Sequence, residues 1–282
     1  MRLLCLWLLS AALLACARRS APSTAPAHRV VSLSPSTTEA MFAVGAKSAL
    51  VGRSRYCDYP PEVVRLPDVG GYIDPSFEAI LALRPDLVTG ARGPSGPTIA
   101  SRLEARGIRT YFPETESVAG IEAMILGLGE RSDHAAEARR TVAEVDARVA
   151  AVERAVKGEQ APRVLFVFGL EPIVVAGPGG FEDELLRHAG ARNVIGEGGR
   201  YPTIGMERVL VLDPDVVLDA SADESRGAER ITIDAAGWRE LRAVKLGRVV
   251  LLRDEVVLRP GPRIGEGLAV LARALHPGVA VP

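Results

Sequence analysis

The sequence has few of the residues that most often build catalytic and metal sites. It contains 4 histidines and 3 cysteines among 282 residues, and aromatic residues make up 5% of the chain. None of His28, His134, His188 and His276 has the spacing of a metal-ligand motif or lies beside a serine or cysteine motif. We therefore expect neither a bound metal ion nor a histidine-based catalytic site.

An excess of charge of either sign is also absent. The 34 lysines and arginines are balanced by 35 aspartates and glutamates. A nearly neutral chain has no broad basic face, so no nucleic-acid partner is expected. The segment 177–180 (GPGG) precedes a predicted helix, but it lacks the Lys-Ser/Thr of a P-loop and the Gly-x-Gly-x-x-Gly of a dinucleotide site. It predicts a tight turn.

Only the N-terminus carries a run apolar enough to interact with a membrane. Arg2 precedes the run Leu3–Leu14, which is shorter than the roughly 20 residues that span a bilayer. The run indicates a signal peptide, and the sequence LLAC ending at Cys16 resembles the bacterial lipobox. That resemblance implies removal of residues 1–15 and lipid attachment to Cys16, although an ordinary secretory signal remains an alternative.

The residues after the signal predict a flexible tether. Residues 16–27 are rich in Ala, Ser and Pro, a composition typical of disordered linkers. Cys5 would leave with the signal and Cys16 would carry the lipid, so Cys57 is expected to have no partner for an internal disulfide.

The rest of the chain contains an internal repeat. Phe77–Val88 (FEAILALRPDLV) and Met206–Val217 (MERVLVLDPDVV) match at six of twelve positions, including Glu78/Glu207 and Asp86/Asp215. Further matched segments occur in the same order: Arg29–Leu33 with Arg163–Phe168, Glu39–Lys47 with Glu184–Arg192, and Arg102–Phe112 with Glu240–Leu252. Several matches in one order indicate a duplication.

A long amphipathic helix is predicted between the two copies, over Ser132–Lys157. Val142, Val145, Val149, Val152 and Val156 form one apolar stripe at helical spacing. Ser132 is the predicted N-cap and Gly158 the predicted stop. Such a helix would extend roughly 39 Å and could brace two bodies.

Each half alternates strands and helices, which predicts an α/β fold with two Rossmann-like lobes and mainly parallel sheets. The predicted lobes are residues 28–131 and 159–282, joined by one long rigid helix at 132–158. Ligands of parallel sheets bind at the carboxyl ends of the strands. The loops expected there are Ser34–Thr37, Tyr56–Tyr59, Gly70–Asp74, Arg92–Gly96, Gly169–Pro172, Gly198–Thr203, Ser221–Arg226 and Arg253–Arg263.

The repeated Glu78 and Glu207 have two interpretations. Each begins a helix, where a carboxylate is stabilised by the helix dipole. Alternatively, the pair projects outward, one per lobe, and docks onto a two-fold symmetric partner that offers a basic residue from each subunit.

Several motifs together resemble a known family. The runs RVVSLSPSTTEAMFAVGAKSALVGRSRYCDYPP and VGGYIDPSFEAILALRPDLV, continued by VLFVFG, YPTIGMERVLVLDPDVV and AVKLGRVVLL, are similar to the cobalamin-binding proteins of bacterial ABC importers. That family belongs to a wider group serving corrinoids, haem and iron–siderophores. The resemblance implies the class III substrate-binding fold. It also implies that Glu78 and Glu207 engage arginines of a permease dimer served by ATPase subunits.

The resemblance further implies a corrinoid held between the lobes by aromatic, proline and backbone contacts. The residues implied are Ser34, Pro35, Tyr56, Tyr59, Tyr72, Arg92, Phe168, Gly169, Tyr201, Asp254 and Arg259. A corrin is a flat apolar ring rimmed with amides, which such a site suits. Tyr56 and Tyr59 could instead hold their proline-rich loop, Phe168 could be core, and Trp238 is interpreted as packing.

The sequence thus predicts a monomeric, lipid-anchored, extracytoplasmic solute-binding protein that is not an enzyme and has cobalamin as a transported ligand rather than a cofactor. Haem or a ferric siderophore is the alternative ligand. A lipoprotein outside transport and an enzyme with a two-lobed α/β cleft are the alternatives in other classes.

Overall fold

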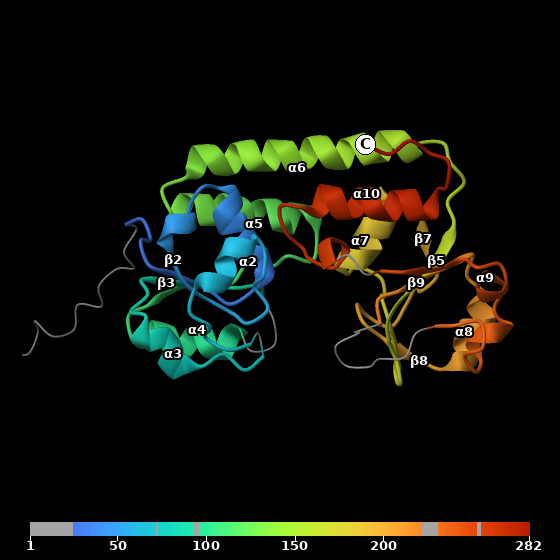
Figure 1. Cartoon of the computed structure of the whole chain (residues 1–282), viewed down its shortest axis with the longest axis horizontal. Coiled ribbons are helices and arrows are strands. Elements are labelled where there is room, and N and C mark those ends of the chain that lie inside the picture. The colour runs from blue at the N-terminus through green and yellow to red at the C-terminus, as the bar shows by residue number, and fades with distance from the viewer. Residues whose placement is uncertain (1–24, 72, 93–95, 222–230, 253–254) are drawn as a thin grey trace, which may run out of the picture.

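The computed structural model describes residues 25–71, 73–92, 96–221, 231–252 and 255–282, and these residues form two α/β lobes (Figure 1). The first lobe has a four-stranded parallel sheet in the order β2-β1-β3-β4. Its elements are β1 Val30–Ser32, α2 Pro35–Ala43, η2 Lys47–Ala49, β2 Leu50–Arg53, η3 Pro61–Arg65, α3 Phe77–Ala82, β3 Leu87–Thr89, α4 Gly96–Glu104, β4 Arg109–Tyr111 and α5 Val118–Arg131.

The second lobe has a sheet in the order β10-β9-β5-β6-β8, with β7 beside β5. Strands β10, β9, β5 and β7 are parallel, whereas β6 and β8 run antiparallel to their neighbours. The elements are β5 Arg163–Leu170, β6 Ile173–Val175, α7 Phe181–His188, β7 Arg192–Asn193, β8 Thr203–Ile204, α8 Met206–Leu212, β9 Val216–Asp219, η5 Trp238–Glu240, α9 Arg242–Lys245, β10 Val249–Leu251, η6 Glu255–Val257 and α10 Ile264–Leu275. The fold class expected from the sequence is confirmed.

A hairpin in the second lobe differs from the prediction. Half of the expected loop 169–172 is strand, because β5 continues to Leu170 and a two-residue turn leads into antiparallel β6. Gly169 therefore lies in a strand and pairs with Val174. Alternation of polar and apolar residues cannot reveal this hairpin, because β5 is apolar at every position after Arg163 and is buried on both faces over Val164–Val167.

The duplicated residues hold equivalent places in the two lobes. Asp86 accepts a hydrogen bond from the amide of His28 at 2.9 Å, and Asp215 accepts one from Arg163 at 2.9 Å. Arg29 also donates to the last carbonyls of α3, as Arg163 does for α8. The same arginine thus fixes the same helix in each lobe.

One core continues beneath both sheets. Side chains alternate across each strand, so Val30 and Phe166 enter this shared core, while Val31 and Leu165 enter separate clusters of their own lobes. Trp238 is buried in the second-lobe cluster, as its packing interpretation predicted.

The connection between the lobes is α6, Ala135–Val156, which lies along one side of the molecule over α5 and α10 (Figure 1). Val145, Val149, Val152 and Val156 are buried in the shared core, so the predicted stripe is confirmed. With 22 residues the helix extends roughly 33 Å.

The predicted N-cap of this helix is wrong. Ser132 ends α5 instead, where its hydroxyl donates to the carbonyl of Leu128 at 2.8 Å. Asp133 has a φ of 62°, which breaks the helix, and α6 begins after His134. The sequence Ser-Asp is compatible both with the end of one helix and with the start of the next, so the local sequence does not distinguish the two. The other end agrees with prediction, because Gly158 has a φ of 90° just beyond the helix.

Ala27 is buried, and its amide donates a hydrogen bond to the carbonyl of Arg131. Within the described ranges, none of the helices combines the length and hydropathy needed to cross a bilayer.

Candidate functional site

Two groups of polar side chains connect the lobes. The first, the Glu39 cluster, consists of Glu39 and Asp58 of the first lobe with Arg259 and Arg263 of the second. Arg263 binds both oxygens of Glu39, with its Nε at 2.8 Å and its Nη2 at 2.9 Å. Arg259 binds Asp58 at 2.7 and 3.1 Å and approaches Glu39 at 3.4 Å.

The Glu39 cluster is balanced in charge, and three of its side chains are mostly shielded from water, whereas that of Asp58 is 54% exposed. The side chain of Glu39 is 3% exposed, and that of Arg259 is 14% exposed. The guanidinium of Arg263 also lies 3.7 Å from the ring centroid of Tyr59, a cation–π geometry. The hydrogen bonds to Glu39 raise the pKa of Arg263 above its usual value, so this arginine stays charged.

The second group, the Tyr201 bridge, consists of Glu116, Tyr201 and Glu182. The phenol oxygen of Tyr201 lies 3.2 Å from an oxygen of Glu116 in the first lobe. It lies equally far, 3.2 Å, from an oxygen of Glu182 at the start of α7 in the second lobe. Nearby, the amide of Val118 donates to Glu184 at 2.9 Å, again across the lobes.

The electrostatics of the Tyr201 bridge differ from those of the Glu39 cluster. Burial raises the pKa of Glu182 from its ordinary value of 4.5 to about 7, and the nearby charge of Glu116 adds to the effect. Burial and the two carboxylates also raise the pKa of Tyr201. Among the residues that the structure describes, no lysine or arginine pairs with either carboxylate.

An aromatic wall adjoins this bridge. Phe168 and Tyr201 meet edge to face with ring centroids 5.6 Å apart, and Phe166 lies 5.1 Å behind Phe168. Phe168 is half-buried, whereas Tyr201 is exposed. Two residues named separately from the sequence are thus brought together on the second lobe.

The first-lobe residues named from the sequence do not form one group, and each makes a different kind of contact. Ser34 is buried, caps α2, and accepts a hydrogen bond from Ala91 at 2.9 Å, so its hydroxyl is engaged within the protein. Pro35 begins α2 and is half-buried. Tyr56 and Tyr59 are exposed rings, and Arg92 lies 3.9 Å from Glu114 at the surface.

Three named residues, Tyr72, Asp254 and Cys16, lie outside the described residues. Cys57 is a free, buried thiol whose sulfur lies 3.1 Å from the hydroxyl of Thr38, and burial raises its pKa. Within the described part of the chain, no three His, Cys, Asp or Glu side chains are grouped to hold a metal ion.

The family is decided by comparison with known sequences. The model of the periplasmic binding protein family matches residues 30–256, most of the chain. The chain belongs to the periplasmic binding protein family. Members of this family and the relatives below are binding proteins of transport systems, and the chain is a substrate-binding protein.

Individual relatives extend this finding. The chain is 29% identical to the vitamin B12-binding protein of Photorhabdus laumondii over 238 residues, which cover 84% of this chain and 83% of the relative. The solved vitamin B12-binding protein of Vibrio cholerae is 27% identical, with a TM-score of 0.76 over 89% of this chain and 97% of that one. A solved haem-binding protein of Pseudomonas aeruginosa is 31% identical, with a TM-score of 0.78 over 90% and 94%.

In this periplasmic binding protein, five residues of the Glu39 cluster and the Tyr201 bridge were not named as site residues from the sequence. They are Glu39, Asp58, Glu116, Glu182 and Arg263. Glu39 and Arg263 are 224 positions apart, and nothing local marks them as partners. The one available signal is Glu39 itself, a charge within an otherwise buried helix.

The repeated glutamates occupy equivalent surfaces. Glu78 and Glu207 are both exposed and are each the second residue of a short helix, α3 or α8. Both helices lie on the side of the molecule away from α6 (Figure 1). Their geometry supports both the helix-dipole and the docking interpretation.

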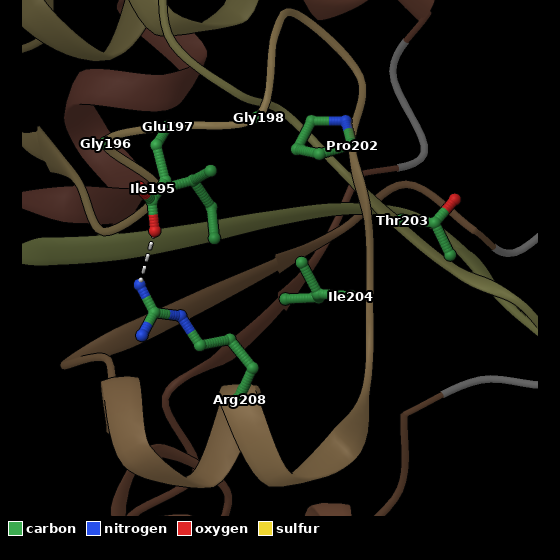
Figure 2. A pocket seen from close by; sticks show the side chains of 8 residues that line it. All are labelled: Ile195, Gly196, Glu197, Gly198, Pro202, Thr203, Ile204 and Arg208. Atoms are coloured by element: carbon green, nitrogen blue, oxygen red, sulfur yellow. Dashed lines mark hydrogen bonds and ion pairs between the residues drawn. The ribbon is translucent and has the colours of Figure 1, made fainter.

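A hollow of about 350 Å³ lies beside α8. It is lined by Ile195, Gly196, Glu197, Gly198, Pro202, Thr203, Ile204 and Arg208. Figure 2 shows Arg208 reaching across it toward Glu197, at 3.4 Å. A larger groove of about 710 Å³ lies between α6 and α10, crossed by the Arg148–Glu266 ion pair at 2.9 Å. The predicted aromatic ligand residues line neither space.

Proposed function

We propose that this protein captures a cobalamin-type corrinoid between its two lobes and delivers it to an ABC importer. The observation that carries the proposal is the aromatic wall of Phe168 and Tyr201 beside a contact between the lobes. An exposed aromatic face suits a flat apolar macrocycle. The similarity to two vitamin B12-binding proteins supports the same ligand.

The charges between the lobes favour a ligand with a neutral rim. Arg259 and Arg263 are already neutralised by Glu39 and Asp58. The amides of a corrin need hydrogen-bonding groups, whereas the propionates of haem need uncompensated positive charge. The balanced Glu39 cluster offers hydrogen-bonding groups but little uncompensated positive charge.

Isothermal titration of the purified mature protein with cyanocobalamin, haem and a ferric siderophore tests this proposal. We expect binding of cyanocobalamin at micromolar concentration or below, and weaker binding of the other two. Tyr201→Ala with Phe168→Ala should weaken cobalamin binding at least tenfold, because buried aromatic contacts contribute about 1.5–3 kcal/mol each. Exposed Leu246→Ala, at the C-terminal end of α9, serves as an apolar control. Absence of cobalamin binding would overturn the proposal.

Haem binding is the second candidate. It is favoured by the likeness to the haem-binding protein of Pseudomonas aeruginosa, which is as high as the likeness to the B12-binding structure. Haem binding tighter than cobalamin binding in the same titration would select it. A ferric siderophore would be selected in the same way.

We further propose that Glu78 and Glu207 dock this protein onto a permease dimer. Both carboxylates are exposed, and Arg29 and Arg163 hold their helices in the same manner. A pair of equivalent carboxylates suits one arginine from each of two symmetric subunits.

Charge reversal separates docking from binding. Glu78→Arg with Glu207→Arg should leave ligand affinity unchanged but abolish ligand-stimulated ATP hydrolysis by the importer in vesicles. Glu130→Arg with Glu144→Arg, on the exposed surfaces of α5 and α6, is the matched control. Unaltered ligand-stimulated ATP hydrolysis with Glu78→Arg plus Glu207→Arg would exclude the docking role.

The remaining features complete the proposal. A lipid on Cys16 and the tether to residue 27 would hold the domain at an extracytoplasmic membrane surface. The protein acts as a monomer, without catalysis and without nucleic acid. Mass spectrometry of the membrane-extracted protein tests the lipid, and an unmodified Cys16 in the mature chain would refute the anchor.

A further inference from the structure

The Tyr201 bridge contains two oxygen–oxygen pairs at hydrogen-bond distance, but the phenol supplies a proton for only one of them. The phenol oxygen lies 3.2 Å from one oxygen of Glu116 and 3.2 Å from one oxygen of Glu182. A phenol has one proton and an ionised carboxylate has none. With both carboxylates ionised, one contact is a hydrogen bond and the other places two lone pairs against each other.

One added proton resolves this conflict. If the carboxyl of Glu182 is protonated, it donates to the phenol oxygen, and the phenol donates to the carboxylate of Glu116. The result is an unbroken chain of two hydrogen bonds from the second lobe to the first. Glu182 is the carboxyl that takes the proton, because it is 6% exposed and Glu116 is more accessible.

Among the residues that the structure describes, no lysine or arginine pairs with Glu182. The neighbouring carboxylates Asp183 and Glu184 are engaged elsewhere, with the amides of Gly179 and Val118. The groups that favour its charged form are its own amide at the start of α7 and the phenol of Tyr201, and neither is a cation. Charged and titratable groups on α7 and on the elements around it include Glu116, Glu122, Asp146, Glu153, Asp183, Glu184, Arg187, His188, Arg200 and Tyr201, together with Arg192 of β7 and Glu266 and Arg273 of α10.

We propose that Glu182 and Glu116 are positioning residues for Tyr201, and that uptake of one proton by Glu182 fixes the tyrosine ring for the ligand and closes the link between the lobes. The inference rests on the proposed function, because it treats Tyr201 as part of the ligand site. The bridge orients the ring that lies edge to face on Phe168. Its working range is near neutral pH, since burial raises the pKa of Glu182 to about 7.

The first test is the pH dependence of cyanocobalamin binding between pH 5.5 and 8.5. Wild-type affinity should fall about fivefold as pH rises, the worth of one hydrogen bond. Glu182→Gln and Glu116→Gln should each flatten the profile near the low-pH affinity, because either amide supplies the second proton at every pH. Glu130→Gln, a matched change of an exposed glutamate, should keep the wild-type profile.

A second test needs no ligand. The chain has 5 tyrosines, so labelling the tyrosine ζ-carbon with ¹³C gives few resonances, and Tyr201→Phe assigns the one from Tyr201. This resonance should shift with a midpoint near neutral pH in wild type and should not shift in Glu182→Gln.

The outcomes separate this inference from the proposed function. Cobalamin binding with a flat wild-type profile overturns the positioning role and leaves the function standing. Failure to bind cobalamin rejects the function, and the tyrosine resonance then decides the bridge alone. A Tyr201 resonance that is constant from pH 5.5 to 8.5 overturns the inference.

Discussion

The Glu39 cluster and the Tyr201 bridge join the same lobes by opposite electrostatic means. The Glu39 cluster opposes two carboxylates to two guanidiniums, and these charges neutralise one another. The Tyr201 bridge places one phenol between two carboxylates. The first contact is complete as it stands, whereas the second is completed by a proton from solvent.

This difference assigns different duties to the two contacts. A charge-balanced cluster of arginines holds its geometry across the physiological pH range, because arginine does not deprotonate there. A carboxyl with a pKa of about 7 changes its charge within that range. The Glu39 cluster therefore fixes the lobes, and the Tyr201 bridge adjusts them.

The largest expected effect comes from breaking the fixed contact. Glu39→Gln leaves Arg259 and Arg263 partly buried without a full counter-charge, which should cost about 3–5 kcal/mol of the free energy of unfolding. Urea denaturation measures it. The control is Glu266→Gln, which removes an exposed Arg–Glu pair with side chains 55% and 49% exposed and should cost about 0–1 kcal/mol. An equal loss of unfolding free energy in the two variants would show that the burial of Glu39 does not add to the stability of its ion pairs.

An intermediate effect should come from the adjustable contact through pH. The pKa of Glu182 is raised, so its stabilising contribution is complete below the unfolded value of 4.5 and is lost as pH rises through about 7. The full loss corresponds to about 3 kcal/mol.

Glu182→Gln isolates this contribution. The free energy of unfolding of wild type, relative to Glu182→Gln, should be about 3 kcal/mol lower at pH 8 than at pH 4.5. Urea denaturation at the two pH values provides the comparison, and Glu130→Gln should show no such difference. A wild-type advantage that grows with pH would reverse the sign and refute the assignment.

The smallest expected effect concerns the shape of the molecule. Both contacts already join the lobes, and α6 braces them, so ligand binding should change the radius of gyration only slightly. Small-angle scattering with and without cyanocobalamin measures the change. Glu39→Gln combined with Tyr201→Phe should enlarge it. A large compaction of the wild-type protein on binding would contradict the brace.

Local patterns were enough to predict the lobes but not the contacts between them. The repeat around Glu78 and Glu207 and the valine stripe of α6 are local, and both correspond to features of the structure. Helices α5 and α10 were not predicted, although both contribute to the shared core beneath α6. Their apolar residues were not recognised as helical faces.

In the candidate site, too, some residues were named from the sequence, whereas their partners in the other lobe were not. Resemblance named Phe168 and Tyr201, which the structure brings together. It did not name Glu116 or Glu182, which hold Tyr201, since these residues meet only when both lobes are folded. Ser34 illustrates the converse, because a helix-capping serine and a ligand-binding serine have the same local sequence.

The core shared beneath the two sheets has a consequence for folding. Val30 of the first lobe and Phe166 of the second belong to one apolar cluster, closed by α6 and α10. Neither half can bury its face of that cluster alone, so an isolated lobe would expose apolar surface and tend to aggregate. We therefore expect the whole domain to unfold in one cooperative transition, with no stable intermediate in which a single lobe remains folded.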